Sequence, residues 1–141
     1  MNRRCRLLIC DDHPEFRDLV KDVLKRAPNI EIVGEAGNGK EAVDRALRLR
    51  PDVVLMDLNM PELSGLEATR RIRRATKRVR VLMASAFGAE EVIVPCMEAG
   101  ASGFFQKYRP LAELNQAIET VWKGGTFRRP SVFQHASRGD G

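Results

Sequence analysis

The sequence predicts a doubly wound α/β domain in which a parallel sheet of five strands lies between two layers of helices. Short apolar runs alternate five times with amphipathic stretches along the chain. Most of the runs are continuously apolar, as is typical of strands buried on both faces. The 141 residues are enough for one domain of ordinary size and leave little room for a second.

The five apolar runs are the predicted strands, and each is rich in Val, Ile, Leu or Phe. They cover residues 7–10, 30–33, 53–56, 79–84 and 103–105. Helical spacing of apolar residues follows each strand, within residues 16–27, 42–47, 66–75, 89–97 and 111–122. The third of these helices is the weakest prediction, because arginine crowds its exposed positions. Strand, helix, strand in repeated order favours a parallel sheet covered on both faces.

Residues at the ends of the predicted helices support these boundaries. Pro14 suits a first helical turn, where its missing N–H leaves no bond unmade. Asn38 with Glu41 resembles a capping box, and Gly100 and Gly124 are suitable residues for ending the two last helices. After Gly124 the periodicity is lost, so we expect residues 125–141 to be a flexible tail or a truncated linker.

Composition excludes several classes of protein. Hydrophobic residues make up 43% and charged residues 30%, which is typical of a globular chain rather than a disordered one. No apolar run approaches the ~20 residues of a membrane-spanning helix, and we find no secretion signal. The three cysteines have no metal-type spacing, and we expect reduced thiols in a cytoplasmic protein, with Cys10 and Cys96 buried.

Positive charge is concentrated between residues 70 and 80, in the run RRIRRATKRVR, and the whole chain carries a formal charge of +5. We interpret this run as a solvated helix face supported by pairs from Glu67 to Arg70 and Arg71. Direct nucleic-acid binding is the alternative. The run contains no aromatic residue to stack bases and no recognition helix, which disfavours that alternative.

Polar side chains follow the predicted strands at the edge where an open α/β sheet binds ligands. They are Asp11 and Asp12 after the first strand, Asp57 and Asn59 after the third, Ser85 after the fourth and Lys107 after the fifth. Three carboxylates repel one another, and one lysine with one divalent cation would balance their charge. Oxygen ligands with waters left over suit Mg²⁺. We assign no comparable role to Glu35, and we interpret His13 as a helix-start residue rather than a metal ligand.

Five segments in order resemble a CheY-like receiver domain of a two-component response regulator. They are DDH at 11–13, VVLMDLNMP at 53–61, Gly65, Ser85-Ala86 and AGASGFFQK at 99–107. The DDHPEFR opening and the SGLEATRRI segment look most like the NarL/FixJ (LuxR-type) branch. The resemblance implies a receiver domain over residues 1–124 with a flavodoxin-like (βα)5 fold and strand order 2-1-3-4-5.

The resemblance also implies residue roles. Asp57 would accept a phosphoryl group from a sensor histidine kinase or a small phosphodonor such as acetyl phosphate. Asp12 and Asp57 would bind Mg²⁺ directly, Asp11 mainly through water, and Asn59 through its backbone carbonyl. The expected localisation is cytoplasmic.

The same resemblance implies how the signal would spread. Ser85 and Lys107 would hold the phosphoryl group, and Phe104 would be the aromatic switch that rotates inward when Ser85 moves. Two departures from the family pattern stand out: Tyr108 replaces a common Pro, and Phe87 is bulky where water access to the acyl phosphate is controlled. Ser64, in place of a common Asp, is expected to matter little.

These residues predict a phosphorylation-controlled binding switch rather than an enzyme with a product. The alternative is a Mg²⁺-dependent phosphohydrolase with an aspartyl nucleophile, as in the haloacid-dehalogenase family, but that family needs an Asp where this chain has Asn59. Relatives of the NarL/FixJ type usually carry a DNA-binding helix-turn-helix domain, for which residues 125–141 are too few. The chain would then be a stand-alone receiver or part of a longer regulator, with phosphorylation-controlled homodimerisation, DNA contact only through the other domain, and no membrane contact.

Overall fold

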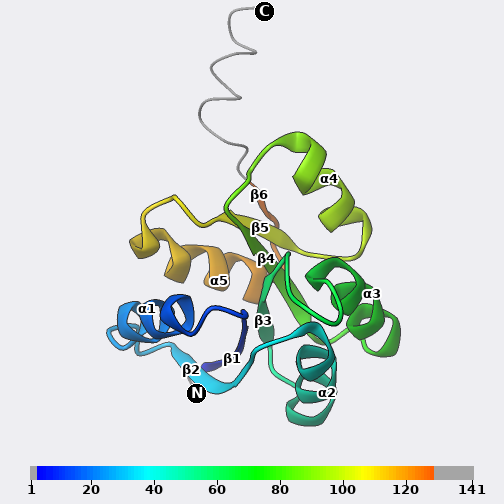
Figure 1. Cartoon of the computed structure of the whole chain (residues 1–141). Coiled ribbons are helices and arrows are strands. Elements are labelled where there is room, and N and C mark those ends of the chain that lie inside the picture. The colour runs from blue at the N-terminus through cyan, green and yellow to red at the C-terminus, as the bar shows by residue number, and fades with distance from the viewer. Residues whose placement is uncertain (1–2, 129–141) are drawn as a thin grey trace, which may run out of the picture.

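The computed structural model describes residues 3–128, which form a parallel sheet between two layers of helices (Figure 1). The strands are β1 (Cys5–Cys10), β2 (Ile30–Ala36), β3 (Val53–Asp57), β4 (Arg80–Ser85), β5 (Gly103–Gln106) and β6 (Phe127–Arg128). The helices are α1 (Pro14–Leu24), α2 (Gly39–Leu49), α3 (Gly65–Ala75), α4 (Glu90–Glu98), a 3₁₀ turn η1 (Leu111–Glu113) and α5 (Leu114–Trp122). The predicted fold class is therefore confirmed.

The sheet has the order β2-β1-β3-β4-β5-β6, and all its strand pairs are parallel. The predicted order of the first five strands is confirmed. The sixth strand was not predicted, because two residues are too few to show a period. Phe127 pairs with Gly103 and is only 4% exposed within the core. The expected tail thus begins later than residue 125, and its remainder, residues 129–141, lies outside the described residues.

Two hydrophobic cores lie on opposite faces of the sheet. Helices α1 and α5 cover one face, and α2, α3 and α4 cover the other (Figure 1). Successive residues of β1 alternate between them, with Leu7 in the first core and Leu8 in the second. This alternation explains why the strands read as continuous apolar runs. Cys10 and Cys96 are buried as predicted, and they and Cys5 are free thiols.

The predicted helix ends are confirmed where the described residues test them. Pro14 occupies the first turn of α1, and Asn38 accepts a hydrogen bond of 2.9 Å from the Glu41 backbone N–H. Gly100 and Gly124 have φ values of 111° and 94°, which a side chain rarely allows. The weakest predicted helix is α3, and its N-cap Ser64 accepts a 3.1 Å bond from the Glu67 N–H.

Glu67 also lies 3.2 Å from the guanidinium of Arg70 and 3.5 Å from that of Arg71, as expected for the solvated face of α3. Such exposed pairs contribute little to stability. Among residues 3–128, no helix combines the length and apolar character needed to cross a membrane.

Candidate functional site

The carboxyl edge of the sheet brings together three of the predicted side chains. Asp57 is the last residue of β3, Asp11 directly follows β1, and Lys107 directly follows β5. The turn after β3 is tight, because Gly65 donates a 2.9 Å backbone bond to Leu58. A Cβ at Gly65 would lie 1.9 Å from the Asp57 carbonyl oxygen, so only glycine allows this approach.

Lys107 lies between two buried carboxylates. Its Nζ is 2.7 Å from Asp11 Oδ2 and 3.2 Å from Asp57 Oδ1. The same Nζ lies 4.4 Å from the centroid of the Phe16 ring, within cation–π range. Asp11 and Asp57 are 1% and 4% exposed, so water screens these charges weakly. One cation therefore serves two nearly buried carboxylates.

The pKa of Asp57 reflects this excess of negative charge over positive charge. Burial raises its pKa first, and the nearby charge of Asp11 adds to the effect, so that its pKa rises to about 6 although Lys107 opposes the change. Burial lowers the pKa of Lys107, but its bonds to Asp11 and Asp57 outweigh burial and raise that pKa above the usual value. Lys107 therefore stays charged, and Asp57 keeps its proton to higher pH than an exposed carboxyl.

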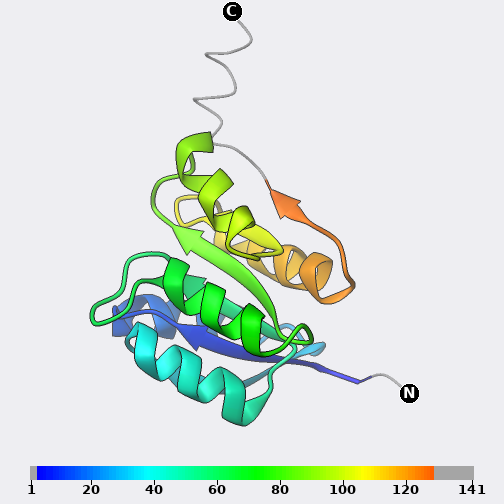
Figure 2. The same cartoon turned by 90° about the vertical axis from the view of Figure 1, so that its right-hand side faces the viewer.

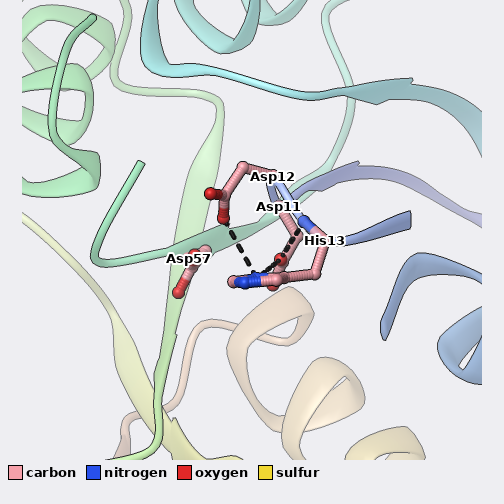
Figure 3. A group of neighbouring side chains, drawn as sticks. All are labelled: Asp11, Asp12, His13 and Asp57. Carbon is pink, nitrogen blue, oxygen red and sulfur yellow. Dashed lines mark hydrogen bonds and ion pairs between the residues drawn. The ribbon is translucent and has the colours of Figure 1, made fainter. Parts of the chain in front are cut away.

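Asp12 completes the acidic cluster, as Figure 3 shows with His13 beside it. His13 Nδ1 lies 3.2 Å from Asp11 Oδ1 and 3.1 Å from Asp12 Oδ1. Asp12 Oδ1 is nevertheless buried without a hydrogen bond. One possible ligand atom from each of these residues and Asp57 lies within 4.8 Å of the others. The unbonded oxygen and the uncompensated carboxylates suit a hard divalent cation such as Mg²⁺.

Ser85 and Phe104 lie next to this edge. Ser85, the last residue of β4, is 1% exposed; its Oγ accepts a 3.2 Å bond from the Phe87 N–H, and its carbonyl accepts one of 2.8 Å from the Lys107 N–H. Phe104 is completely buried in the core on the α4 side. Asn59 is exposed two residues after Asp57. In the described chain, neither Asn59 nor the Ser85 hydroxyl is bonded to the acidic cluster.

A parallel sheet with this acidic edge and lysine has counterparts among known proteins. Residues 7–119 match the family described as the response regulator receiver domain. The chain belongs to this family. Receivers of this kind act as phosphoacceptor switches and not as enzymes with a released product, so the phosphohydrolase alternative is not favoured.

Individual relatives place the receiver in the LuxR/NarL branch, as predicted. This chain is 36% identical over 129 residues to the transcriptional regulatory protein DegU of Brevibacillus brevis. The match covers 92% of this chain and 55% of DegU. The structure of a LuxR-family response regulator from Aurantimonas matches with a TM-score of 0.88 and 34% identity, covering 97% of this chain and 98% of that one.

The signal receiver domain of NarL from Mycobacterium tuberculosis is similar in structure too. It gives a TM-score of 0.83 at 31% identity, covering 86% of this chain and 98% of that one. The curated relatives are longer: this chain spans a little more than half the length of DegU and of the nitrate/nitrite response regulator NarL of Escherichia coli.

Three residues near the receiver site were missed by sequence reasoning. Glu35 accepts hydrogen bonds from Arg17 and Lys21 at 2.9 and 2.8 Å, and Arg17 also donates to the Asp11 carbonyl. The bond from Lys21, with a smaller contribution from Arg17, lowers the pKa of Glu35 despite partial burial. Glu35 thus holds the arginine that holds Asp11. Its place next to the last residue of β2 was the signal that the sequence offered.

Two of the departures from the family pattern, Tyr108 and Phe87, lie on the surface of the receiver. Tyr108 is 81% exposed and follows Lys107 through a trans peptide bond, like every peptide bond among the described residues. Phe87 is 68% exposed, two residues beyond Ser85. Its effect on water access to Asp57 stays a prediction.

Proposed function

We propose that the receiver accepts a phosphoryl group on Asp57 from a sensor histidine kinase or from a small phosphodonor such as acetyl phosphate. The observation that carries the proposal is the position of Lys107, between Asp11 and Asp57 at the acidic edge of the sheet. Lys107 faces Oδ1 of Asp57, which leaves Oδ2 to attack phosphorus. The new O–P bond forms as the donor's P–N or P–O bond breaks, giving an acyl phosphate.

Asp12 and Asp57 would hold Mg²⁺ directly, Asp11 through water, and Asn59 through its backbone carbonyl. Three carboxylates with one lysine leave a formal charge of −2, and the buried Asp12 Oδ1, whose neighbour is His13 Nδ1 at 3.1 Å, makes no hydrogen bond that a cation would have to replace. Bound Mg²⁺ supplies positive charge that screens the phosphoryl oxygens from the carboxylates. With Mg²⁺ held there, Asp57 would ionise at less cost and be available as the nucleophile.

Ser85 and Phe104 would carry the signal away from Asp57. The Ser85 hydroxyl, which now accepts from the Phe87 N–H, would turn to donate to a phosphoryl oxygen while Lys107 holds another. Phe104 is buried in the core on the α4 side, and an inward position of its ring is the one that the proposed switch would favour. Phosphorylation would stabilise this position and change the surface formed by α4, β5 and α5.

The wider role rests on the relatives. The relative DegU is named a transcriptional regulatory protein. One of the similar solved structures is named a DNA-binding response regulator of the LuxR family. We infer that this receiver controls transcription in a longer protein through phosphorylation-dependent homodimerisation.

The phosphoacceptor proposal is tested by incubating the chain with acetyl phosphate and Mg²⁺ and measuring the intact mass. We expect one added phosphoryl group, lost in Asp57→Asn and without Mg²⁺. Asp18→Asn is the matched control, because its carboxylate is exposed on α1 and, within residues 3–128, pairs with Lys21 alone; it should still be modified. A folded wild-type chain that gains no phosphoryl group and binds no beryllofluoride would overturn the proposal.

Dimerisation needs a separate measurement. Sedimentation with and without beryllofluoride and Mg²⁺ should show a shift toward a dimer that Asp57→Asn abolishes. A sedimentation coefficient unchanged by beryllofluoride, in a chain that is modified at Asp57, would overturn the dimerisation step alone.

A further inference from the structure

A cavity of about 920 Å³ with a basic rim lies at the amino ends of the strands, on the opposite side of the molecule from Asp57 at their carboxyl ends. It lies between the C-terminal ends of α2 and α3, which lie side by side in Figure 2. Four cations line it, namely Arg3, Arg50, Lys77 and Arg78, against one carboxylate, Asp52. The Asp52 carboxylate is already occupied, because Arg3 binds both its oxygens at 2.9 Å and the Arg6 N–H donates to one at 2.8 Å.

A second basic cavity of about 410 Å³ adjoins the first and shares Lys77 with it. Arg70, Arg73 and Arg74 line it with a single carboxylate, Glu98. We call the seven cations of the two cavities, with Asp52 and Glu98, the basic end of the molecule. Its formal charge is +5, which equals the formal charge of the whole chain, so all other residues together are neutral. Glu67, which pairs with Arg70, lowers this local balance by one, so most of the excess positive charge is still concentrated here.

Most of these cations have no carboxylate partner. Within residues 3–128, the side chains of Arg50, Arg74, Lys77 and Arg78 form no ion pair. Arg73 donates to the carbonyls of Lys77 and Val79, and its Nε is buried without a hydrogen bond. The negative ends of α2 and α3 each offset only about half a charge. An external anion would meet several unneutralised cations at once.

We propose that the basic end binds the phosphate backbone of double-stranded DNA without sequence preference. Six of its seven cations are arginine, whose planar fork binds phosphate oxygens in pairs. The cations are spread over two cavities, along α3, at the C-terminal ends of α2 and α3 and at the start of the chain, which suits an extended polyanion better than one small anion. No aromatic side chain lines either cavity in the described part of the chain, so stacking of single-stranded bases has no platform.

The location adds a functional consequence. The basic end and Asp57 lie at opposite edges of the sheet, so a receiver held on DNA keeps its phosphoacceptor open to a kinase. DNA contact here does not depend on the phosphorylation proposed above, and either can fail without the other. This contact would add sequence-independent affinity and faster association to any regulator that contains the chain.

The test measures fluorescence anisotropy of a short labelled duplex of arbitrary sequence with the chain, from about 50 to 200 mM salt. Arg74→Glu with Lys77→Glu is compared with Arg26→Glu with Lys40→Glu. All four side chains are exposed, and both double variants reduce the formal charge from +5 to +1. We expect the first pair to weaken binding at least about tenfold and to lower the slope of log affinity against log salt by about two. The control pair should change affinity less than about threefold.

Two results would overturn the proposal. Equal weakening in both pairs would mean a general attraction of a cationic chain, and equal affinity for poly-glutamate of matched charge would mean an acidic protein partner instead of DNA. The circular dichroism spectrum and thermal melting of each variant, compared with those of the wild type, show whether it is folded, whatever the outcome of the phosphorylation test. Should Arg74→Glu with Lys77→Glu not fold, Lys77→Gln with Arg78→Gln removes two charges from the same end and should weaken DNA binding about threefold or more.

Discussion

Replacing Asp57 with asparagine is expected to make the receiver more stable at neutral pH in the absence of Mg²⁺. The carboxylate is 4% exposed and faces Asp11, so its ionised form is unfavourable in the folded chain. Asparagine has nearly the same shape and carries no charge. The gain comes from the removal of a destabilising charge and not from any new contact.

The size of the gain follows from the pKa of Asp57, which folding raises from 3.8 to about 6. A difference of roughly two, at about 1.4 kcal/mol per pH unit, corresponds to about 3 kcal/mol. Because the folded-state pKa is the higher one, the native state holds its proton longer than the unfolded state. The penalty is therefore absent below pH ~4, grows between pH ~4 and ~6, and is complete above pH 6.

Urea unfolding of both chains, followed by the fluorescence of Trp122, the single tryptophan, measures this difference. With a chelator at pH 8, Asp57→Asn should be more stable by up to about 3 kcal/mol, and the gap should close as the pH falls to about 4. Mg²⁺ at ten times its dissociation constant should narrow the gap by about 1.4 kcal/mol through stabilisation of the wild type. A variant less stable than wild type at pH 8, or a gap independent of pH, would refute the reasoning.

Three further substitutions probe the same fold. Lys107→Ala leaves two buried carboxylates without their cation, so it should lower the free energy of unfolding at pH 7 by about 3 kcal/mol in urea titrations, and an unchanged midpoint would contradict the ion-pair geometry. Gly65→Ala forces a Cβ to within 1.9 Å of the Asp57 carbonyl oxygen. It should lower the free energy of unfolding by more than about 2 kcal/mol and abolish modification by acetyl phosphate. The control is Gly37→Ala, whose Cβ would have its nearest contact at 3.8 Å and which should be nearly neutral. Phe127→Ala removes a buried ring and should lower the free energy of unfolding by about 3 kcal/mol, which thermal melting would show as a lower melting temperature. An unaffected melting temperature would show that β6 contributes nothing to stability.

Local sequence was enough to predict the elements and most of the site. Strands buried on both faces need continuous apolar runs, and each run ends where the chain reaches water. Asp57 and Ser85 were found because parallel strands bring their carboxyl ends to a single edge. Strand order and residue roles came from the resemblance to receivers, since periodicity does not say which strands are neighbours.

Contacts between distant segments were not readable in this way. Lys107 binds Asp11 across 96 residues, and Phe16 meets Lys107 because α1 packs beside η1, which follows β5 in the chain. Strand β6 depends on the space that Gly103 leaves for Phe127, which a window of two residues does not reveal.

The Arg-rich run of α3 is another case in which the sequence did not reveal contacts between distant segments. Read alone it predicted a solvated face, and the pairs of Glu67 with Arg70 and Arg71 agree. Only folding adds Arg3 and Arg50, from the start of the chain and the end of α2, to the cations of residues 70–78.

The sequence by itself determined the fold class, the acidic edge and its lysine, because burial and strand ends are properties of short segments. Tertiary structure decided which charges are neutralised and which are not. Coulomb energy depends on distance and on exclusion of water, and both are set only when remote segments pack together. The packing of remote segments therefore makes Asp57 costly to ionise and leaves the cations of the basic end unpaired.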